Sequence, residues 1–421
     1  ETRLFTLADI NQWIGAKDKN HEVKSLRYAI FPYAKQSLVL VENFTERMLV
    51  DWKARKVVWR QSAGIQDHTD WSPASRATAY VRDHNLFVID GEGRVRQIST
   101  DGSREMVYGV TAYREMFGIY KGTFWNPDGS RLAFYRMDQT MVPDYPLVDV
   151  DPDSMAVLAP EKYPMAGRTT HEVTIGVYDV KADKTIYLKV GNPKDRYFVN
   201  IGWSPDGKTI YLKEFNRKQN EMSLDAYDAV TGDKRATLYT ERHEKYITSY
   251  TSVAFLPWDA DKFILQSQKD GYNHLYLFNT KGEMLRQLTS GNFVVYDLLG
   301  FDKARKRAII LSAESSPIQS NLYAVDIATG KRTLLDNGRG VHANIISSSG
   351  FHDRALSPDG GWIIDNYAEP TVPRNIDFIN LKTDKSTRYF TADNPWKDYA
   401  EPPLLHPRAR AGSAAGIDRK S

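Results

Sequence analysis

Short apolar runs recur along the chain, and most of them follow a turn of similar sequence. The run at residues 132–135 (LAFY) follows the turn at 125–129 (WNPDG), and the run at 209–212 (TIYL) follows the turn at 203–207 (WSPDG). Related turns begin at Trp71, Phe255, Phe301 and Leu356. Apolar runs of this length, bounded by Pro and Gly turns, are typical of buried β-strands. The pattern therefore predicts one strand unit that is repeated along the chain.

A second motif alternates with the first and marks a tight reversal of the chain. In residues 227–232 (YDAVTG) and 325–330 (VDIATG) an apolar run ends at an Asp, and a Gly follows a few residues later. An Asp side chain at such a position hydrogen-bonds the backbone two residues on, and Gly accepts the positive φ of a hairpin turn. Variants of the motif, some of them without the Gly, occupy residues 50–58, 89–93, 178–184, 278–282 and 379–384. They predict the outer hairpin of each repeated unit.

Strand units that recur in this way, joined by short turns, predict the blades of a β-propeller, which is an all-β fold. Counting a weaker turn at residues 30–32, the sequence contains seven recognisable blades. We expect a single propeller over residues 1–402, because no linker rich in Pro, Gly or Ser interrupts it. Residues 140–170 are expected to form an insertion beyond the blade pattern. Residues 403–421, rich in Arg, Ala and Gly, are expected to be a disordered tail.

Composition excludes several classes of function. The 421 residues include 56 basic and 53 acidic side chains, interspersed along the chain, for a net charge of +3. Nucleic-acid binding needs a concentrated basic face, so no nucleic acid is expected as a partner. No apolar run is long enough to span a membrane. The chain has no cysteine, which rules out disulfides and thiolate metal sites and leaves the cellular compartment open.

One acidic segment, residues 149–154 (DVDPDS), has the alternating carboxylates of a calcium loop. It lacks the Gly at the sixth position of such a loop and the Glu at the twelfth, where Pro160 stands. A solvated turn is the better interpretation, and we expect neither a metal ion nor a cofactor.

Several dispersed strings give the chain a resemblance to a known family. They are residues 117–119 (FGI), 121–125 (KGTFW), 132–139 (LAFYRMDQ), 163–167 (YPMAG), 270–277 (DGYNHLYL) and 370–373 (PTVP). In this order they resemble the N-terminal propeller of the dipeptidyl peptidase IV group of the prolyl oligopeptidase superfamily. The similarity is greatest to its bacterial prolyl tripeptidyl aminopeptidase branch, and it extends over residues 5–399.

The resemblance implies an eight-bladed propeller that covers an α/β-hydrolase domain with a Ser-His-Asp triad. Members of this group are serine exopeptidases that cleave peptides near the N-terminus, commonly after proline. On this basis the first blade is expected to be incomplete, and the hydrolase domain to be absent because the chain stops where that domain would begin, near Glu401. The nucleophile motif G-x-S-x-G does not occur in the sequence. We therefore expect no catalytic residues here and no peptide hydrolysis by this chain alone.

The resemblance also implies partners and a location. The propeller is expected to gate access to the hydrolase domain, which is its partner together with a peptide substrate. An exported or periplasmic location is expected. The insertion at residues 140–170 is expected to reach a second subunit of a homodimer.

The resemblance implies one substrate-binding site on this chain, at residues 113–117 (YREMF). In the family a short helical stretch of the propeller carries glutamate that binds the free α-ammonium of the peptide. Dipeptidyl peptidases have paired glutamates at the positions of Arg114 and Glu115, whereas the tripeptidyl branch has its glutamate at the position of Met116. A carboxylate that faces a desolvated ammonium makes a strong, charge-assisted hydrogen bond. We therefore expect Glu115, with its neighbour Arg114, to bind the substrate N-terminus.

Two alternatives remain open on the sequence. Glu115 is an ordinary solvated charge if it pairs with Arg114 or Lys121. The chain is a stand-alone protein-interaction module if it has no hydrolase partner, since propellers with similar turns bind proteins without any enzyme attached. The sequence downstream of Glu401 would distinguish the two functions, because a hydrolase domain would bring the motif G-x-S-x-G.

Overall fold

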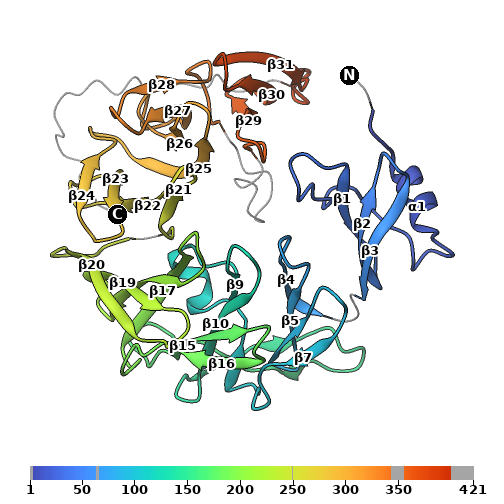
Figure 1. Ribbon diagram of the computed structural model, residues 1–421, viewed down its shortest axis with the longest axis vertical. Helices are drawn as coiled ribbons and strands as arrows, with labels where there is room; N and C mark the ends of the chain where they lie inside the picture. The colour runs from blue at the N-terminus through green and yellow to red at the C-terminus, as the bar shows by residue number, and fades with distance from the viewer. Residues whose placement is uncertain (1–2, 63–65, 249, 343–354, 400–421) are drawn as a thin grey trace.

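The computed structural model describes residues 3–62, 66–248, 250–342 and 355–399. In this part of the chain, seven antiparallel blade sheets stand around a common axis, as Figure 1 shows. The chain passes from one sheet to the next in sequence order. The predicted all-β propeller with seven blades is confirmed.

The first four sheets follow one another from the N-terminal side. The first contains β1 (Leu38–Glu42), β2 (Glu46–Asp51) and β3 (Lys56–Ser62), and the second contains β4 (Asp67–Trp71), β5 (Thr78–Arg82), β6 (Asn85–Ile89) and β7 (Val95–Gln97). The third contains β8 (Met106–Tyr108), β9 (Thr123–Trp125), β10 (Arg131–Asp138), β15 (Glu172–Asp179) and β16 (Lys184–Tyr187). The fourth contains β17 (Arg196–Trp203), β18 (Thr209–Asn216), β19 (Glu221–Asp228) and β20 (Lys234–Arg242).

The remaining three sheets complete the described ring. The fifth contains β21 (Ala254–Leu256), β22 (Asp259–Ser267), β23 (His274–Asn279) and β24 (Met284–Gln287). The sixth contains β25 (Val295–Asp302), β26 (Arg307–Ser312), β27 (Asn321–Asp326) and β28 (Arg332–Leu334). The seventh contains β29 (Trp362–Glu369), β30 (Val372–Asn380) and β31 (Lys385–Thr391).

Both sequence motifs occupy the turns that were predicted for them. The turn at residues 203–207 joins β17 to β18, and the hairpin at residues 227–232 joins β19 to β20. In each of the seven sheets the second motif joins the last two strands. Gly207 has φ +66°, and an added Cβ would lie 2.7 Å from Nδ2 of Asn126. The positive φ and this close contact therefore favour glycine at this turn.

The tryptophans of the turn motif join neighbouring blades. Nε1 of Trp125 donates to the carbonyl oxygen of Asp70 at 2.9 Å, in the second sheet. Nε1 of Trp203 donates in the same way to the carbonyl oxygen of Phe124 at 3.0 Å, in the third sheet. One apolar cluster combines buried side chains of the third and fourth sheets, Tyr135 among them. Burial between adjacent blades therefore stabilises the ring.

One helix was not predicted from the sequence. α1 (Leu7–Ile14) packs Ile10 and Ile14 against the first sheet. Its first turn is closed by a capping box, in which Oγ1 of Thr6 accepts from the N–H of Asp9 at 3.1 Å and the Asp9 carboxylate accepts from the N–H of Thr6 at 2.7 Å. Within the described residues no helix has the length and apolar character needed to cross a bilayer.

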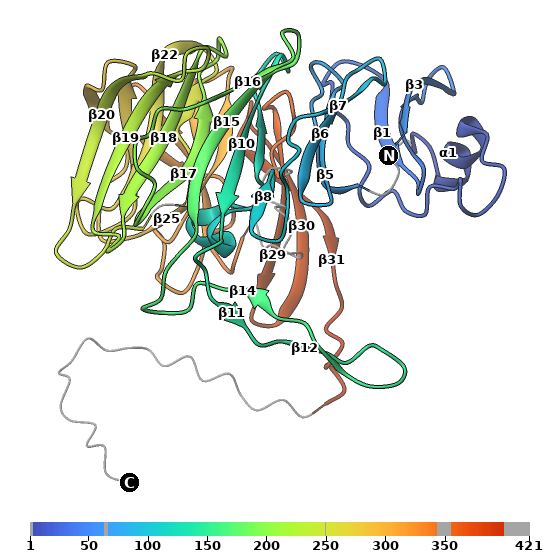
Figure 2. The same ribbon diagram turned by 90° about the horizontal axis from the view of Figure 1, so that it is seen from below.

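Residues 140–170 form an arm between β10 and β15. Here β11 (Asp144–Tyr145) pairs with β14 (Glu161–Lys162), and β12 (Val148–Asp149) pairs with β13 (Val157–Leu158). Figure 2 shows the arm extending away from the ring. Residues 149–154 are exposed along it, in agreement with a solvated turn.

The described ring is open between its first and last sheets, as Figure 1 shows. A pocket of about 810 Å³ lies there, lined by Ile30 and Phe31 ahead of β1 and by Trp362, Ile364 and Phe378 of the last sheet. The expected eighth blade is not among the described residues. The expected tail at residues 403–421 lies outside the described part of the chain.

Candidate functional site

The predicted site falls on a short helical turn within the third sheet. η1 (Tyr113–Gly118), a 3-10 helix, lies between β8 and β9. The expectation of a short helical stretch at these residues is confirmed. The side chains of Arg114 and Glu115 lie outside the described part of the structure, so their role in substrate binding stays a prediction.

The backbone of η1 has an unusual shape at both ends. Tyr113, Phe117 and Gly118 have φ angles of +59°, +61° and +67°. Two of these residues are large and aromatic, and the left-handed region is disfavoured for such side chains. Conformations of this kind persist only where the surrounding structure holds them, and they are concentrated at functional sites.

Tyr113 anchors the first end of η1. The residue is 2% exposed, and its hydroxyl accepts a hydrogen bond from the backbone N–H of Phe198 at 3.0 Å. Its own N–H donates to Nε2 of His171, also at 3.0 Å. Burial raises the pKa of Tyr113 far above its ordinary value, so the hydroxyl stays protonated. The start of η1 is thereby fixed to β17 and to the residue before β15.

The other end of η1 is held by β17 and by the chain at Tyr250. Asn200 lies at a bulge of β17 with φ +54°, and its Nδ2 donates to the carbonyl oxygen of Phe117 at 2.8 Å. Gly118 packs so closely that an added Cβ would lie 2.4 Å from the carbonyl oxygen of Tyr250. Only glycine meets both this contact and the positive φ.

A pocket of about 650 Å³ begins where η1 ends. One wall contains Gly118 and Tyr120, and another contains Val341 and His342. Exposed aromatic side chains contribute to the lining, namely Tyr120, Tyr250 and Tyr296. A mostly apolar pocket of this size, with a few polar groups, has the character of a ligand-binding site.

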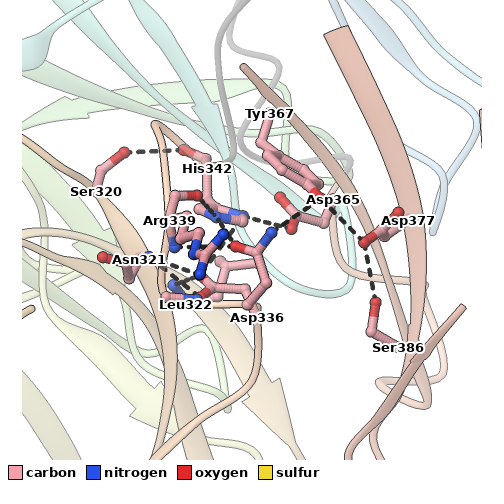
Figure 3. A network of polar contacts seen from close by, with 12 residues as sticks. Ser320, Asn321, Leu322, Asp336, Arg339, His342, Asp365, Tyr367, Asp377 and Ser386 are labelled. Atoms are coloured by element: carbon pink, nitrogen blue, oxygen red, sulfur yellow. Dashed lines mark hydrogen bonds and ion pairs between the residues drawn. The ribbon is translucent and has the colours of Figure 1, made fainter. Parts of the chain in front are cut away.

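The wall at His342 is held by a buried cluster of ionisable side chains, drawn in Figure 3. Nδ1 of His342 lies 2.7 Å from Oδ2 of Asp365 and 3.5 Å from Oδ2 of Asp336. Nε2 of His342 lies 2.6 Å from the carbonyl oxygen of Arg339. The ring of Tyr367 stacks on the imidazole with centroids 4.2 Å apart. Because Asp365 and Tyr367 belong to β29, the cluster joins the seventh sheet to the sixth.

The geometry defines the protonation of His342. A carbonyl oxygen and an ionised carboxylate can only accept hydrogen bonds, so both ring nitrogens carry a proton. Burial lowers the pKa of His342, but the hydrogen bond and charge of Asp365, with the charge of Asp336, outweigh burial and leave it raised. Burial also raises the pKa of Asp336. An imidazolium between two carboxyl groups therefore stabilises this wall.

Sequence reasoning located one wall of the pocket and missed the other. It placed the site on η1, and it considered Lys121 as a pairing partner of Glu115. In the structure Nζ of Lys121 lies 3.0 Å from Oδ2 of Asp70. The cluster around His342 gave no signal, because its members come together only where two blades pack. His171 lies just after the YPMAG string, which indicated the family and not the contact with η1.

The fold defines the chain as a β-propeller domain, and the pocket beside η1 is its candidate binding site. The model of one family, the "Dipeptidyl peptidase IV (DPP IV) N-terminal region", matches residues 25–374. The chain belongs to this family.

Individual relatives agree with the family. A Bacteroides ovatus protein described as a dipeptidyl aminopeptidase IV is 35% identical in sequence, with a TM-score of 0.83. The match covers 94% of this chain and 57% of the Bacteroides ovatus chain. Porphyromonas gingivalis dipeptidyl peptidase 4 has the same fold, with a TM-score of 0.70 and 24% identity over 87% of this chain and 50% of its own. An Aspergillus flavus protein described as a dipeptidyl peptidase 4 is 27% identical over 82% of this chain and 46% of its length. The chain therefore spans about half the length of these proteins.

Proposed function

We propose that this chain is the N-terminal propeller of a serine exopeptidase, in which it gates access and binds the free N-terminus of a peptide. The substrates are peptides cleaved near the N-terminus, commonly after proline, by a hydrolase domain outside this chain. The observation that supports the proposal most is the pocket of about 650 Å³ that starts at the end of η1. A peptide whose first residue lies there has its ammonium close to the turn that carries Glu115.

Glu115 supplies the negative charge of the proposed site. A carboxylate on a turn that is fixed at both ends meets an ammonium with little further loss of conformational freedom. The exposed aromatic side chains of Tyr120 and Tyr250 line the same pocket and offer apolar surface to the rest of the peptide. Arg114 is assigned to the same site as the neighbouring residue of η1. Peptides with a blocked N-terminus cannot make this contact and are rejected.

The test is kinetic and uses a protein in which this chain is joined to its hydrolase domain. Glu115→Ala is expected to lower kcat/KM for free-amine peptides by about 10² to 10³, or about 3 to 4 kcal/mol, because one partner of a desolvated charged pair is lost. N-acetylated peptides, already poor substrates, should barely change.

Met116→Ala is the matched control for this experiment. Met116 lies on the same turn, is exposed and carries no charge. Its removal should therefore leave the selection between free and acetylated peptides as it was. An unaltered preference for free-amine peptides in Glu115→Ala would reject the anchor.

We further propose that the arm contacts a second subunit in the complete protein. It exposes large apolar side chains, among them Val150, Met155 and Leu158, which are 75%, 74% and 68% exposed. Apolar side chains gathered on a projecting hairpin mark an interaction surface. Removal of residues 144–163 is expected to convert a homodimer into a monomer in light scattering, and an unchanged mass would exclude this role.

The same exposed arm favours the second candidate function, a stand-alone module that binds other proteins. The two functions differ in one property that can be measured. A module of this kind has no reason to prefer peptides with a free N-terminus, whereas the propeller of an exopeptidase has. Loss of amine selectivity in Glu115→Ala therefore supports the exopeptidase and speaks against the module.

A further inference from the structure

η1 has no cap of its own. Ala112 precedes the helix, and its side chain cannot accept any of the N–H groups that are left unpaired at a helix start. The N–H of Tyr113 donates instead to Nε2 of His171, at 3.0 Å, from a separate part of the chain. An acceptor from outside the helix thus takes the role of the usual capping side chain.

The position and surroundings of His171 suit this role. The residue is 3% exposed, and its ring stacks on that of Tyr113 with centroids 4.9 Å apart and planes 26° from parallel. It directly precedes β15 and follows the last residues of the arm. A backbone N–H can donate only to a ring nitrogen without a proton, so Nε2 is the unprotonated nitrogen.

These contacts act on a backbone that would not keep its shape alone. Tyr113 has φ +59°, a conformation that an unconstrained tyrosine rarely adopts. The hydrogen bond to His171 fixes the peptide group between Ala112 and Tyr113, directly ahead of Arg114 and Glu115. Loss of the acceptor would release this peptide group and change the direction in which the next residues leave it.

We propose that His171 is a positioning residue for Glu115: it caps η1 from outside and holds the backbone of the turn that carries Glu115. The inference rests on the proposed function of Glu115. It adds a physical link between the arm and the proposed substrate site, because His171 directly follows the arm in the chain and contacts η1.

Two variants separate the hydrogen bond from the ring. His171→Phe keeps a flat aromatic ring for the stack and has no acceptor. His171→Gln has an amide oxygen that can reach the position of Nε2. The first measurement is hydrogen exchange of the Tyr113 amide in the 421-residue chain. We expect exchange about tenfold faster in His171→Phe and close to the wild-type rate in His171→Gln.

Equal exchange in the wild-type and His171→Phe chains would overturn the capping role. This measurement needs no substrate, so its outcome does not depend on the function of Glu115. It also detects misfolding directly, because a variant that fails to fold loses protection in all seven sheets and not in η1 alone. If His171→Phe fails to fold, His171→Gln is the variant that tests the cap. Its Tyr113 amide must stay protected from exchange.

The second measurement is kinetic, in the protein joined to its hydrolase domain. His171→Phe is expected to raise KM for free-amine peptides by about tenfold with a smaller change in kcat, and His171→Gln to recover most of the loss. An equal loss on free-amine and acetylated peptides would overturn the positioning role. Faster exchange in His171→Phe combined with unaltered selectivity in Glu115→Ala would reject the proposed function and leave the cap in place.

Discussion

Two walls of one pocket are each held by a buried histidine, and the two histidines have opposite hydrogen-bonding roles. On the η1 wall, Nε2 of His171 accepts from the N–H of Tyr113 at 3.0 Å. On the second wall, both nitrogens of His342 face acceptors, Oδ2 of Asp365 at 2.7 Å and the carbonyl oxygen of Arg339 at 2.6 Å. His171 accepts a hydrogen bond through a nitrogen that carries no proton, whereas His342 donates through both of its ring nitrogens.

The difference shows that the partner atoms decide what a buried histidine contributes. The contact at His171 adds no charge to the η1 wall. The second wall concentrates a cation and two carboxyl groups, and the side chains of His342, Asp336 and Asp365 are at most 1% exposed. Removing one member of a buried charged group costs far more than losing a neutral hydrogen bond. Mutation and pH should therefore affect the two walls differently.

The largest effect is expected at His342. His342→Leu leaves Asp336 and Asp365 buried without a cation, and the free energy of unfolding should fall by about 3 to 5 kcal/mol. Adding Asp365→Asn removes the carboxylate that lies nearest to Nδ1 and should restore part of the loss, while Asp336 keeps the N–H groups of Leu322 and Gly338 as its donors. Urea unfolding measures all of these variants. A loss below about 1 kcal/mol in the single variant would show that charge does not hold this wall.

A smaller effect is expected from pH. The folded pKa of His342 is raised above its ordinary value of 6.5, so its stabilising contribution is complete below that pH and is lost as the pH rises through the raised pKa. The pKa of Asp336 is also raised, and its contribution is lost in the same direction, starting from the ordinary value of 3.8. Rising pH should therefore weaken the second wall.

The double variant His342→Leu, Asp365→Asn, which keeps Asp336, is the control for this pH effect. Burial lowers the pKa of Lys213 to about 8, which means that burying this group as a cation costs stability. That cost decreases as the pH rises, so the effect of Lys213 on stability is opposite to that of His342. Lys213 is present in both proteins, and its contribution cancels in the difference. From about pH 6.5 upward the wild-type chain should lose stability relative to the control, by about 1.4 kcal/mol per unit of raised pKa. Parallel curves would contradict the charged cluster.

The smallest effect is expected on the η1 wall. Tyr113→Phe removes the hydroxyl that accepts from the N–H of Phe198 and leaves that N–H buried without its partner. The free energy of unfolding should fall by about 1 to 2 kcal/mol. Because no charge is involved, the loss should be the same at about pH 6 and about pH 9. If the loss of unfolding free energy in Tyr113→Phe changed with pH, the proposed difference between a neutral η1 wall and a charged second wall would be wrong.

The propeller could be predicted from the sequence because its signals are local. Each turn and each outer hairpin is encoded within a few consecutive residues, and the strands between them are short. α1 also has a local signal, the capping box of Thr6 and Asp9, but it lies outside the repeated pattern. The fold could be assigned because the turn and hairpin motifs repeat along the chain, and no single motif would have been enough.

The site could be predicted only in part. η1 was located because it lies next to strings that resemble the family. The partners of the two histidines are distant in sequence: Tyr113 is 58 residues from His171, and Asp365 is 23 residues from His342. No local pattern encodes a contact between blades or between the base of an arm and a turn, so these residues needed the structure.

We expect η1 to bind the free N-terminus of a peptide through Glu115. Calorimetric titration of the 421-residue chain with one proline-containing tripeptide, as the free amine and in N-acetylated form, tests it most directly. The wild-type chain is expected to bind the free amine at least about tenfold more tightly, and Glu115→Gln to bind both forms equally. Equal affinities in the wild-type chain, or the same preference in Glu115→Gln, would contradict the account.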